Sequence, residues 1–225
     1  MGEFQTAWDP TESKSFDELI AHYQEGGVRA QKYADIIASA DCRFFSAGAS
    51  ESWDLWLSRE KRFEGAAFPG LENDLSFFSS VLGGHLLTDL GSGKESFMRS
   101  FARRFGVKLF LEVDLAYRKS EGMSPDTDDT LQIIRTQEDM LRAVALMPDS
   151  CSNFTINGIG LELITSREYH AALAHELVRA TQPHGVIFGF GSDVSAYLEK
   201  YPELNNRGLE STNVADHFVF QKRAG

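Results

Sequence analysis

Apolar and polar positions follow two different patterns along this chain of 225 residues. In the first 80 residues the apolar side chains recur at helical spacing, and Ser15 and Glu18 stand at the spacing of a helix-capping box. The pair Gly26-Gly27 then predicts the end of this first helix. Further helical patterns occupy residues 28–40, 50–63 and 71–82. The first part of the chain therefore predicts helices and little else.

From His85 onward, short apolar runs with strand character alternate with helical patterns. The runs are residues 85–90, 107–115, 131–136, 152–158 and 184–190. Such alternation is typical of βαβ units and a parallel sheet. Two more strand-like runs, 207–212 and 217–223, have no room for a crossover helix between them, so they predict an antiparallel hairpin.

Together these patterns predict an α/β fold of three layers. We expect a doubly wound, mostly parallel, seven-stranded sheet with a terminal antiparallel hairpin on its edge. Residues 1–80 would form an N-terminal helical extension or lid, and residues 81–225 the domain that holds the sheet.

A glycine loop follows the first predicted strand. Asp89 stands near the strand end, and residues 91–93 read Gly-Ser-Gly. Doubly wound sheets bind ligands at the carboxyl ends of their strands, where the strand order reverses. The loop is therefore the first candidate for a binding site.

The loop fits neither of two common phosphate-binding motifs. A P-loop requires Ser or Thr at the position of Glu95 and glycine at the position of Thr88. A dinucleotide fingerprint requires a third glycine at the position of Ser96, and the carboxylate of Asp89 would disfavour a pyrophosphate. A ligand with a positive charge and no phosphate fits the loop better.

Several segments, in order, resemble the class I S-adenosylmethionine-dependent methyltransferases. They are "LLTDLGSGKES", "LFLEVDLAYR", "TQEDMLRAVALMPDS", "SNFTINGIG" and "HELVRATQPHGVIFGFG", followed by the terminal hairpin. The resemblance covers about residues 86–222 and excludes the helical N-terminal part. It implies a Rossmann-like domain in residues 81–225 that binds S-adenosylmethionine.

The resemblance also implies roles for single residues. Asp114 would hold the ribose hydroxyls, Asp139 would face the adenine amino group, and Met140 would pack on the adenine ring. The cofactor-binding residues it implies are Asp89, Gly91, Ser92, Gly93, Asp114, Leu115, Glu138, Asp139, Met140 and Asn157. Simpler explanations stay open: Asp89 and Asp114 as helix caps or turn residues, Glu138 and Asp139 as acids favoured by the helix dipole, and Met140 as a general packing residue.

One departure from the family pattern concerns Glu95, which stands where the family commonly has a further glycine. Its side chain would either crowd the cofactor or take over a contact to the cofactor's amino group. No general base and no metal site emerge from the sequence.

The expected activity is methyl transfer from S-adenosylmethionine to a small-molecule acceptor. The first alternative is a non-catalytic S-adenosylmethionine-binding protein with a regulatory or assembly role. A nicotinamide-dependent oxidoreductase is a second alternative, disfavoured by the missing third glycine and by the terminal hairpin.

Net charge and composition limit the classes of binding partner and the cellular location that we expect for this protein. The net charge of −11 and pI of about 5.0 disfavour nucleic acid, and no apolar run approaches membrane-spanning length. Cys42 and Cys151 form no cysteine framework, and the N-terminus shows no secretory signal. We therefore expect a cytoplasmic protein without a nucleic-acid or membrane partner, and its oligomeric state stays open.

Overall fold

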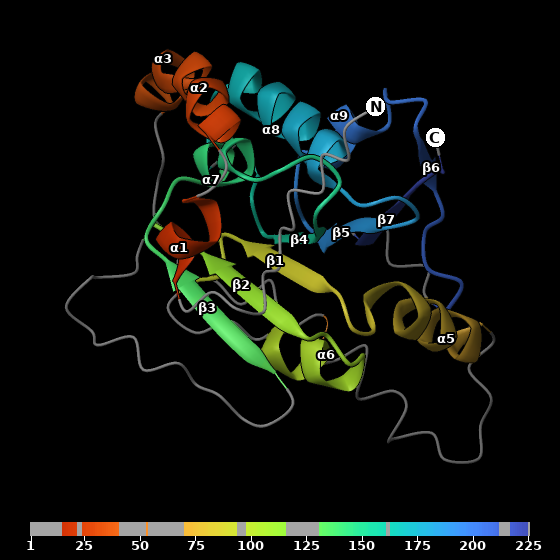
Figure 1. The fold of residues 1–225 in the computed structure, drawn as a ribbon. Helices are drawn as coiled ribbons and strands as arrows, with labels where there is room; N and C mark the ends of the chain where they lie inside the picture. Colours follow the sequence, from red (N-terminus) through yellow and green to blue (C-terminus); the bar gives the residue numbers. More distant parts are fainter. Residues whose placement is uncertain are drawn as a thin grey trace, which may run out of the picture.

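The computed structural model describes residues 15–21, 24–40, 53, 70–93, 98–115, 131–160, 163–211 and 217–224. A sheet of seven strands runs through its centre in the order β3-β2-β1-β4-β5-β7-β6 (Figure 1). The strands are β1 (Leu86–Leu90), β2 (Leu109–Val113), β3 (Gln132–Thr136), β4 (Asn153–Asn157), β5 (Val186–Phe190), β6 (Leu204–Asn206) and β7 (His217–Lys222).

The strand directions confirm the predicted fold. The strands β1 to β5 pair in parallel, whereas β7 pairs antiparallel with both β5 and β6. The central strands β1, β2 and β4 are buried along their whole length, as expected for a parallel sheet covered on both faces.

Helices cover the two faces of the sheet and complete the three layers (Figure 1). The helices α5 (Leu71–Leu82) and α6 (Met98–Arg104) pack on one face. The opposite face carries α7 (Met140–Leu146), α8 (Arg167–Ala180) and α9 (Ser195–Leu198). Each face has its own cluster of buried apolar side chains. Because the helices that connect the strands lie on both faces, the sheet is doubly wound.

Three short helices at the N-terminal end are α1 (Phe16–Ile20), α2 (Gln24–Lys32) and α3 (Ala34–Ser39). The capping box is confirmed, because the Ser15 hydroxyl accepts from the Glu18 amide at 3.2 Å and the Glu18 carboxylate accepts from the Ser15 amide. The helix end predicted at Gly26-Gly27 is wrong, because α1 ends at Ile20 and both glycines lie inside α2.

Close packing of α2 on α7 explains the glycine inside α2. A Cβ on Gly26 would overlap the carbonyl oxygen of Leu146, the last residue of α7. Arg29, one turn further along α2, donates to the carbonyl of Ala145 at 3.1 Å and to Asp149 at 2.9 Å. A tertiary contact therefore overrides the stop signal that the two glycines give locally.

The first strand of the terminal hairpin was predicted at residues 207–212, and this is wrong. The strand β6 lies at 204–206, and its partner β7 begins at His217 as predicted. Only Leu204 of β6 is buried, and two exposed asparagines follow it, so the strand shows no apolar alternation. The described part of this run, residues 207–211, contributes a turn that Asp74 of α5 holds by accepting from Arg207 and from the amides of Glu210 and Ser211.

The N-terminal part of the chain reaches both faces of the sheet. Helix α2 packs on α7, whereas Trp53, the described residue of segment 50–63, is buried with α5 and α6 on the other face. The predicted boundary at residue 80 falls inside α5. The use of residues 1–80 as a lid stays a prediction. Within the described residues, no helix is both long and apolar enough to span a bilayer.

Candidate functional site

The predicted glycine loop lies at the carboxyl end of β1, in the centre of the sheet. Strand β1 has β2 on one side and β4 on the other, so the strand order reverses at this place. The crossover through α6 lies on one face, and those through α7 and α8 lie on the other. The loop therefore occupies the position at which doubly wound sheets bind ligands.

Both glycines of the loop adopt left-handed backbone conformations, with φ of 71° at each. The amides of Gly91 and Ser92 donate to the carbonyl of Val113, at 2.9 and 3.3 Å. The amide of Gly93 donates to Oδ2 of Asp114 at 2.8 Å. The loop thus turns toward the end of β2, and Asp114 holds it there. The glycine loop and Asp114 therefore lie next to each other, as predicted.

The two glycines have different surroundings. A Cβ on Gly91 would stand 2.7 Å from Cδ1 of Ile159 and 3.4 Å from Sδ of Met140, so glycine permits a close approach there. A Cβ on Gly93 would meet no described atom within 4 Å. No described atom therefore occupies the space beside the second glycine, whose amide is bonded to the Asp114 carboxylate.

An apolar side chain is exposed at the residue that follows Asp114. Leu115 is 38% exposed, one of two large exposed apolar side chains in the described part of the chain. The carbonyl of Leu115 accepts from the side-chain amide of Gln137, which follows β3. The end of β2 thus carries a carboxylate and, at the next residue, an exposed apolar side chain.

Asp139 is the N-cap of α7. Its Oδ1 accepts from the amide of Arg142 at 3.0 Å, and its Oδ2 accepts from the hydroxyl of Tyr169 at 2.9 Å. Burial raises the pKa of Asp139 above its usual range, although the bonds from Arg142 and Tyr169 act in the opposite direction. These contacts are those of a helix cap, and the adenine role of Asp139 stays a prediction.

Glu138 also makes contacts local to this helix end. One carboxylate oxygen accepts from the amide of Asp139 at 2.9 Å, and the other accepts from the Arg142 guanidinium one turn later. Met140 reaches past this end of α7 to the glycine loop, as the contact with Gly91 shows. The structure therefore brings Met140 to the predicted site.

Two further predicted residues are buried near the carboxyl ends of the central strands β1 and β4. Asp89 is 3% exposed and belongs to β1 itself, which extends one residue further to Leu90. Asn157, at the end of β4, accepts from the indole N–H of Trp53 at 2.8 Å and donates to Thr155 at 2.9 Å. The side chain of Asn157 is thus engaged by the N-terminal part of the chain. Glu95 lies outside the described residues.

Sequence reasoning did not assign a role at this site to three residues that support it. Ile159 contacts Gly91, Tyr169 holds Asp139, and Trp53 holds Asn157. Tyr169 and Trp53 read as ordinary apolar positions of helices. Their partners are 30 and 104 residues away in the chain, so no local pattern could reveal these pairs.

No protein-family model matches this sequence, and no curated protein sequence matches it. Solved structures do resemble it. A protein described as a hemolysin from Streptococcus thermophilus is 14% identical, with a TM-score of 0.43 over 68% of this chain and 65% of the other. TrmN from Thermus thermophilus is 16% identical, with a TM-score of 0.48 over 68% of this chain and 48% of the other.

A third similar structure is the 1,6-didemethyltoxoflavin-N1-methyltransferase of Burkholderia thailandensis, solved with S-adenosylhomocysteine. It is 11% identical, with a TM-score of 0.44 over 84% of this chain and 97% of the other. This chain spans less than two thirds of the length of the hemolysin and about half of TrmN. Likeness at this level says nothing about activity.

The order and direction of the strands decide the fold. Five parallel strands in the order 3-2-1-4-5 are followed by β7, which runs antiparallel between β5 and β6. This chain therefore has the fold of the class I S-adenosylmethionine-dependent methyltransferases.

Proposed function

We propose that this protein binds S-adenosylmethionine at the carboxyl ends of β1 and β2 and transfers the methyl group to a small-molecule acceptor. The observation that supports the proposal best is the bond from the Gly93 amide to Asp114. It places a carboxylate beside a glycine loop that lacks a pyrophosphate-binding motif, at the reversal of the strand order. S-adenosylmethionine is positively charged and has no phosphate, so it suits such a site.

The described residues offer the groups that this cofactor needs. Asp114 can accept hydrogen bonds from a ribose diol, and among the described residues no atom lies within 4 Å of a Cβ built on Gly93. Leu115 offers apolar surface for the adenine ring, whereas Met140 is 8% exposed and its packing on the ring stays a prediction. Covering Leu115, which is now 38% exposed, would add favourable apolar burial to binding.

When bound, S-adenosylmethionine would supply an electrophilic methyl group on a sulfonium: a lone pair of the acceptor would form the new bond to the methyl carbon, and the electron pair of the broken carbon–sulfur bond would go to sulfur. The part of the protein is to hold both reactants in line. The glycine loop, which Asp114 holds at the end of β2, would form one wall of the cofactor site. A base is required only if the acceptor keeps its proton at the working pH.

A small-molecule acceptor fits the charge distribution better than a nucleic acid. The segment 99–108 is rich in basic residues, but Arg99 pairs with the buried carboxylate of Glu112 at 2.5 Å. Arg135 pairs with the same carboxylate at 2.9 Å. These cations neutralise a buried acid, and the chain as a whole carries a charge of −11.

Calorimetry on the full chain tests cofactor choice. We expect S-adenosylmethionine and S-adenosylhomocysteine to bind, and NADH to bind at least about tenfold more weakly because the loop offers no pyrophosphate cradle. Tight NADH binding without any heat from S-adenosylhomocysteine would refute the proposal.

Turnover needs a separate experiment. The protein is incubated with metabolite extracts and S-adenosylmethionine carrying an isotope-labelled methyl group, and labelled products are sought by mass spectrometry. A labelled small molecule that is absent without the protein is the expected result. Cofactor binding without any labelled product would favour the non-catalytic alternative.

A further inference from the structure

An indole from the N-terminal part of the chain holds a polar side chain at the carboxyl end of β4. Asn157 is the last residue of this strand and is 9% exposed. Its Oδ1 accepts from the indole N–H of Trp53 at 2.8 Å, and its Nδ2 donates to Oγ1 of Thr155 at 2.9 Å. The two bonds fix the Asn157 amide from both ends.

The chemistry of the indole decides how this amide is oriented. An indole N–H donates and cannot accept, so the atom of Asn157 that meets Trp53 is the oxygen, and the nitrogen points the other way. An amide nitrogen carries two N–H groups, of which Thr155 takes one. Among the described residues, the second N–H has no hydrogen-bond partner. A buried donor in this state is costly until a ligand or water pairs with it.

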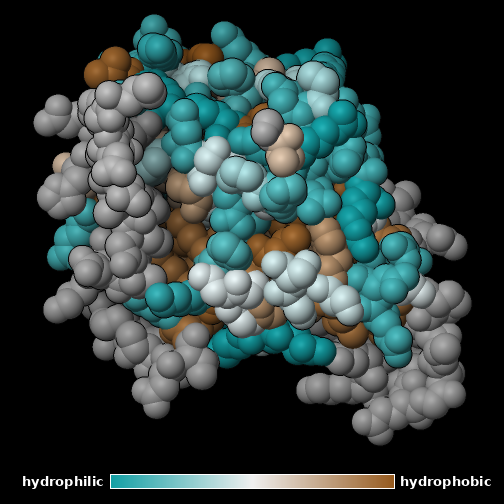
Figure 2. Space-filling model, turned by 45° about the vertical axis from the view of Figure 1, so that its right-hand side comes forward, coloured by the Kyte–Doolittle hydropathy of each residue, from teal (hydrophilic) through white to brown (hydrophobic). Residues whose placement is uncertain are grey.

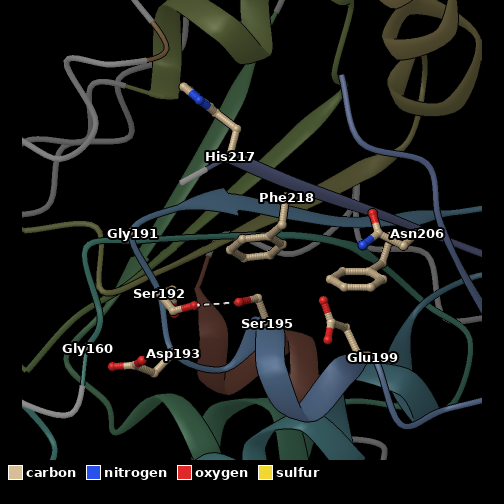
Figure 3. A pocket seen from close by; sticks show the side chains of 10 residues that line it. Gly160, Gly191, Ser192, Asp193, Ser195, Glu199, Asn206, His217 and Phe218 are labelled. Carbon is tan, nitrogen blue, oxygen red and sulfur yellow. Dashed lines mark hydrogen bonds between the residues drawn. The ribbon is translucent and has the colours of Figure 1, made fainter. Parts of the chain in front are cut away.

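The Trp53–Asn157 pair lies on the α5 and α6 side of the sheet. Phe154 and Ile156 pack in the cluster on the opposite side, so Asn157, next in the alternation, faces Trp53. The ring of His217 meets Trp53 on this same side at a centroid distance of 4.9 Å. Figure 3 shows His217 pointing away from the pocket of about 340 Å³ beside α9. That pocket is therefore separate from the pair.

The aromatic side chains around Trp53 serve packing. The indole is surrounded by the rings of three wholly buried residues, Phe78, Phe101 and Phe188. On the side of the molecule shown in Figure 2, hydrophobic residues likewise lie in hollows between hydrophilic ones. Trp53 thus has a fixed place in the core, from which its N–H can hold Asn157.

Asn157 stands beside the first glycine of the loop. Ile156 pairs with Leu90, so the residues that follow them, Asn157 and Gly91, lie side by side. Asp114 ends the strand on the other side of β1. Neighbouring strands are about 4.8 Å apart, so the backbones of Asp114 and Asn157 are roughly 10 Å apart across the loop.

The proposed cofactor would extend over this distance. Its ribose lies on Asp114, and its adenine lies on Leu115, whose carbonyl bonds to the segment after β3. The sulfur-bearing chain leaves the ribose on the side opposite the adenine, so it runs over β1 toward β4. This chain ends in an ammonium and a carboxylate, and a carboxylate is a strong partner for an N–H donor.

From these contacts we infer that the second N–H of Asn157 donates to the carboxylate of the bound cofactor, and that Trp53 is the positioning residue that keeps the amide in its donating orientation. Without the indole N–H, the amide is free to rotate and to present its oxygen to the carboxylate instead. This inference rests on the proposed function and adds a contribution of the N-terminal part of the chain to the cofactor site.

Two ligands that differ by one group test the inference. Calorimetry on the full chain compares S-adenosylhomocysteine with its decarboxylated analogue, which keeps the adenosine, the sulfur and the amino group. Wild type should prefer S-adenosylhomocysteine about tenfold to a hundredfold, because a hydrogen bond to a charged acceptor is lost with the carboxylate. Equal binding of the two ligands would overturn the inference.

Asn157→Asp removes the donor and keeps the shape of the side chain. The new carboxylate still accepts from Trp53, and the Thr155 hydroxyl can donate to it. It has no N–H and repels the cofactor's carboxylate, so the preference for S-adenosylhomocysteine over the analogue should fall about tenfold or more. An unchanged preference in this variant would leave Asn157 with a structural role only.

Trp53→Phe tests the positioning role. It keeps an aromatic ring in the cluster and removes the N–H, so the preference should fall about twofold to tenfold. Phe105→Leu is the matched control, because Phe105 packs on Phe78 and Phe101 in the same cluster. It should lower the melting temperature and leave the preference unchanged. The same small change of preference in both variants would refute a positioning role for Trp53.

NMR of wild type gives a reading that requires no variant to fold. The side-chain N–H signals of Asn157 should shift when S-adenosylhomocysteine binds and shift much less with the decarboxylated analogue. Equal shifts with both ligands would overturn the inference while leaving the proposed function in place. Failure of S-adenosylhomocysteine to bind wild type would instead refute the proposed function.

Discussion

The bond between the Gly93 amide and Asp114 ties two strand ends together at the scale of single residues. The same carboxylate has a structural task and, in the proposed function, a ligand to hold. The two tasks differ in what they change: the first affects the unliganded protein, and the second affects only its affinity for the cofactor.

Asp114→Ala should weaken S-adenosylhomocysteine binding about tenfold to a hundredfold, because a hydrogen bond to a charged acceptor contributes about 1.5–3 kcal/mol. Asp114→Asn should do less harm, since its carbonyl oxygen can still accept one bond. Calorimetry gives the affinities, and thermal scans of the unliganded variants give the structural part. An alanine variant that melts earlier but binds normally would leave Asp114 as a turn residue only.

Residue-scale prediction succeeded where position along a strand decides proximity. The ends of β1 and β2 are adjacent because parallel neighbours end at the same edge, which brings Gly93 to Asp114. The same reasoning could not anticipate that Trp53 engages Asn157, because a single tryptophan in a helical pattern carries no sign of its partner.

At the scale of elements, helix α2 carries two adjacent glycines in opposite surroundings. Gly26 touches the backbone of Leu146 in α7, whereas a Cβ on Gly27 would meet no described atom within 4 Å. Sequence alone reads the pair as a helix end, because helix propensity is a local quantity and the contact with α7 is not. The prediction for β6 was wrong for a similar reason. Backbone pairing with β7 determines where this strand lies, and the pattern of its own side chains does not.

Gly26→Ala should lower the free energy of unfolding by about 1–3 kcal/mol, because the new methyl group has no room beside Leu146. Gly27→Ala should raise it by about 0.5–1 kcal/mol, because alanine favours the helix and nothing obstructs it. Denaturant titrations of the two variants measure both changes. Stabilisation by both substitutions would show that α2 does not pack on α7 in solution.

At the scale of the whole molecule, the N-terminal residues take part in both apolar clusters. Phe16 and Leu19 of α1 belong to one cluster, and Trp53 belongs to the other, where its ring meets those of Phe78, Phe101 and Phe188 at centroid distances of 6.0, 5.3 and 5.2 Å. A Tyr33–Glu176 hydrogen bond of 2.7 Å further ties the segment before α3 to α8.

Deletion of residues 1–60 should therefore destabilise the whole fold. Loss of a buried tryptophan alone costs about 3–5 kcal/mol, a large part of the 5–15 kcal/mol that holds a typical domain together. Near-ultraviolet circular dichroism and thermal scans should show lost aromatic packing and a much lower or absent transition. A truncated chain with the melting temperature of the full chain would instead support a separable lid.

The position of β7 between β5 and β6 has a consequence for the order of assembly. Synthesis produces β6 before β7, yet the strand pairing of β6 is with β7. Until β7 has been synthesised, β6 has no strand to pair with. The edge strand at this end of the sheet can therefore be completed only after a strand that follows it in the chain has been made.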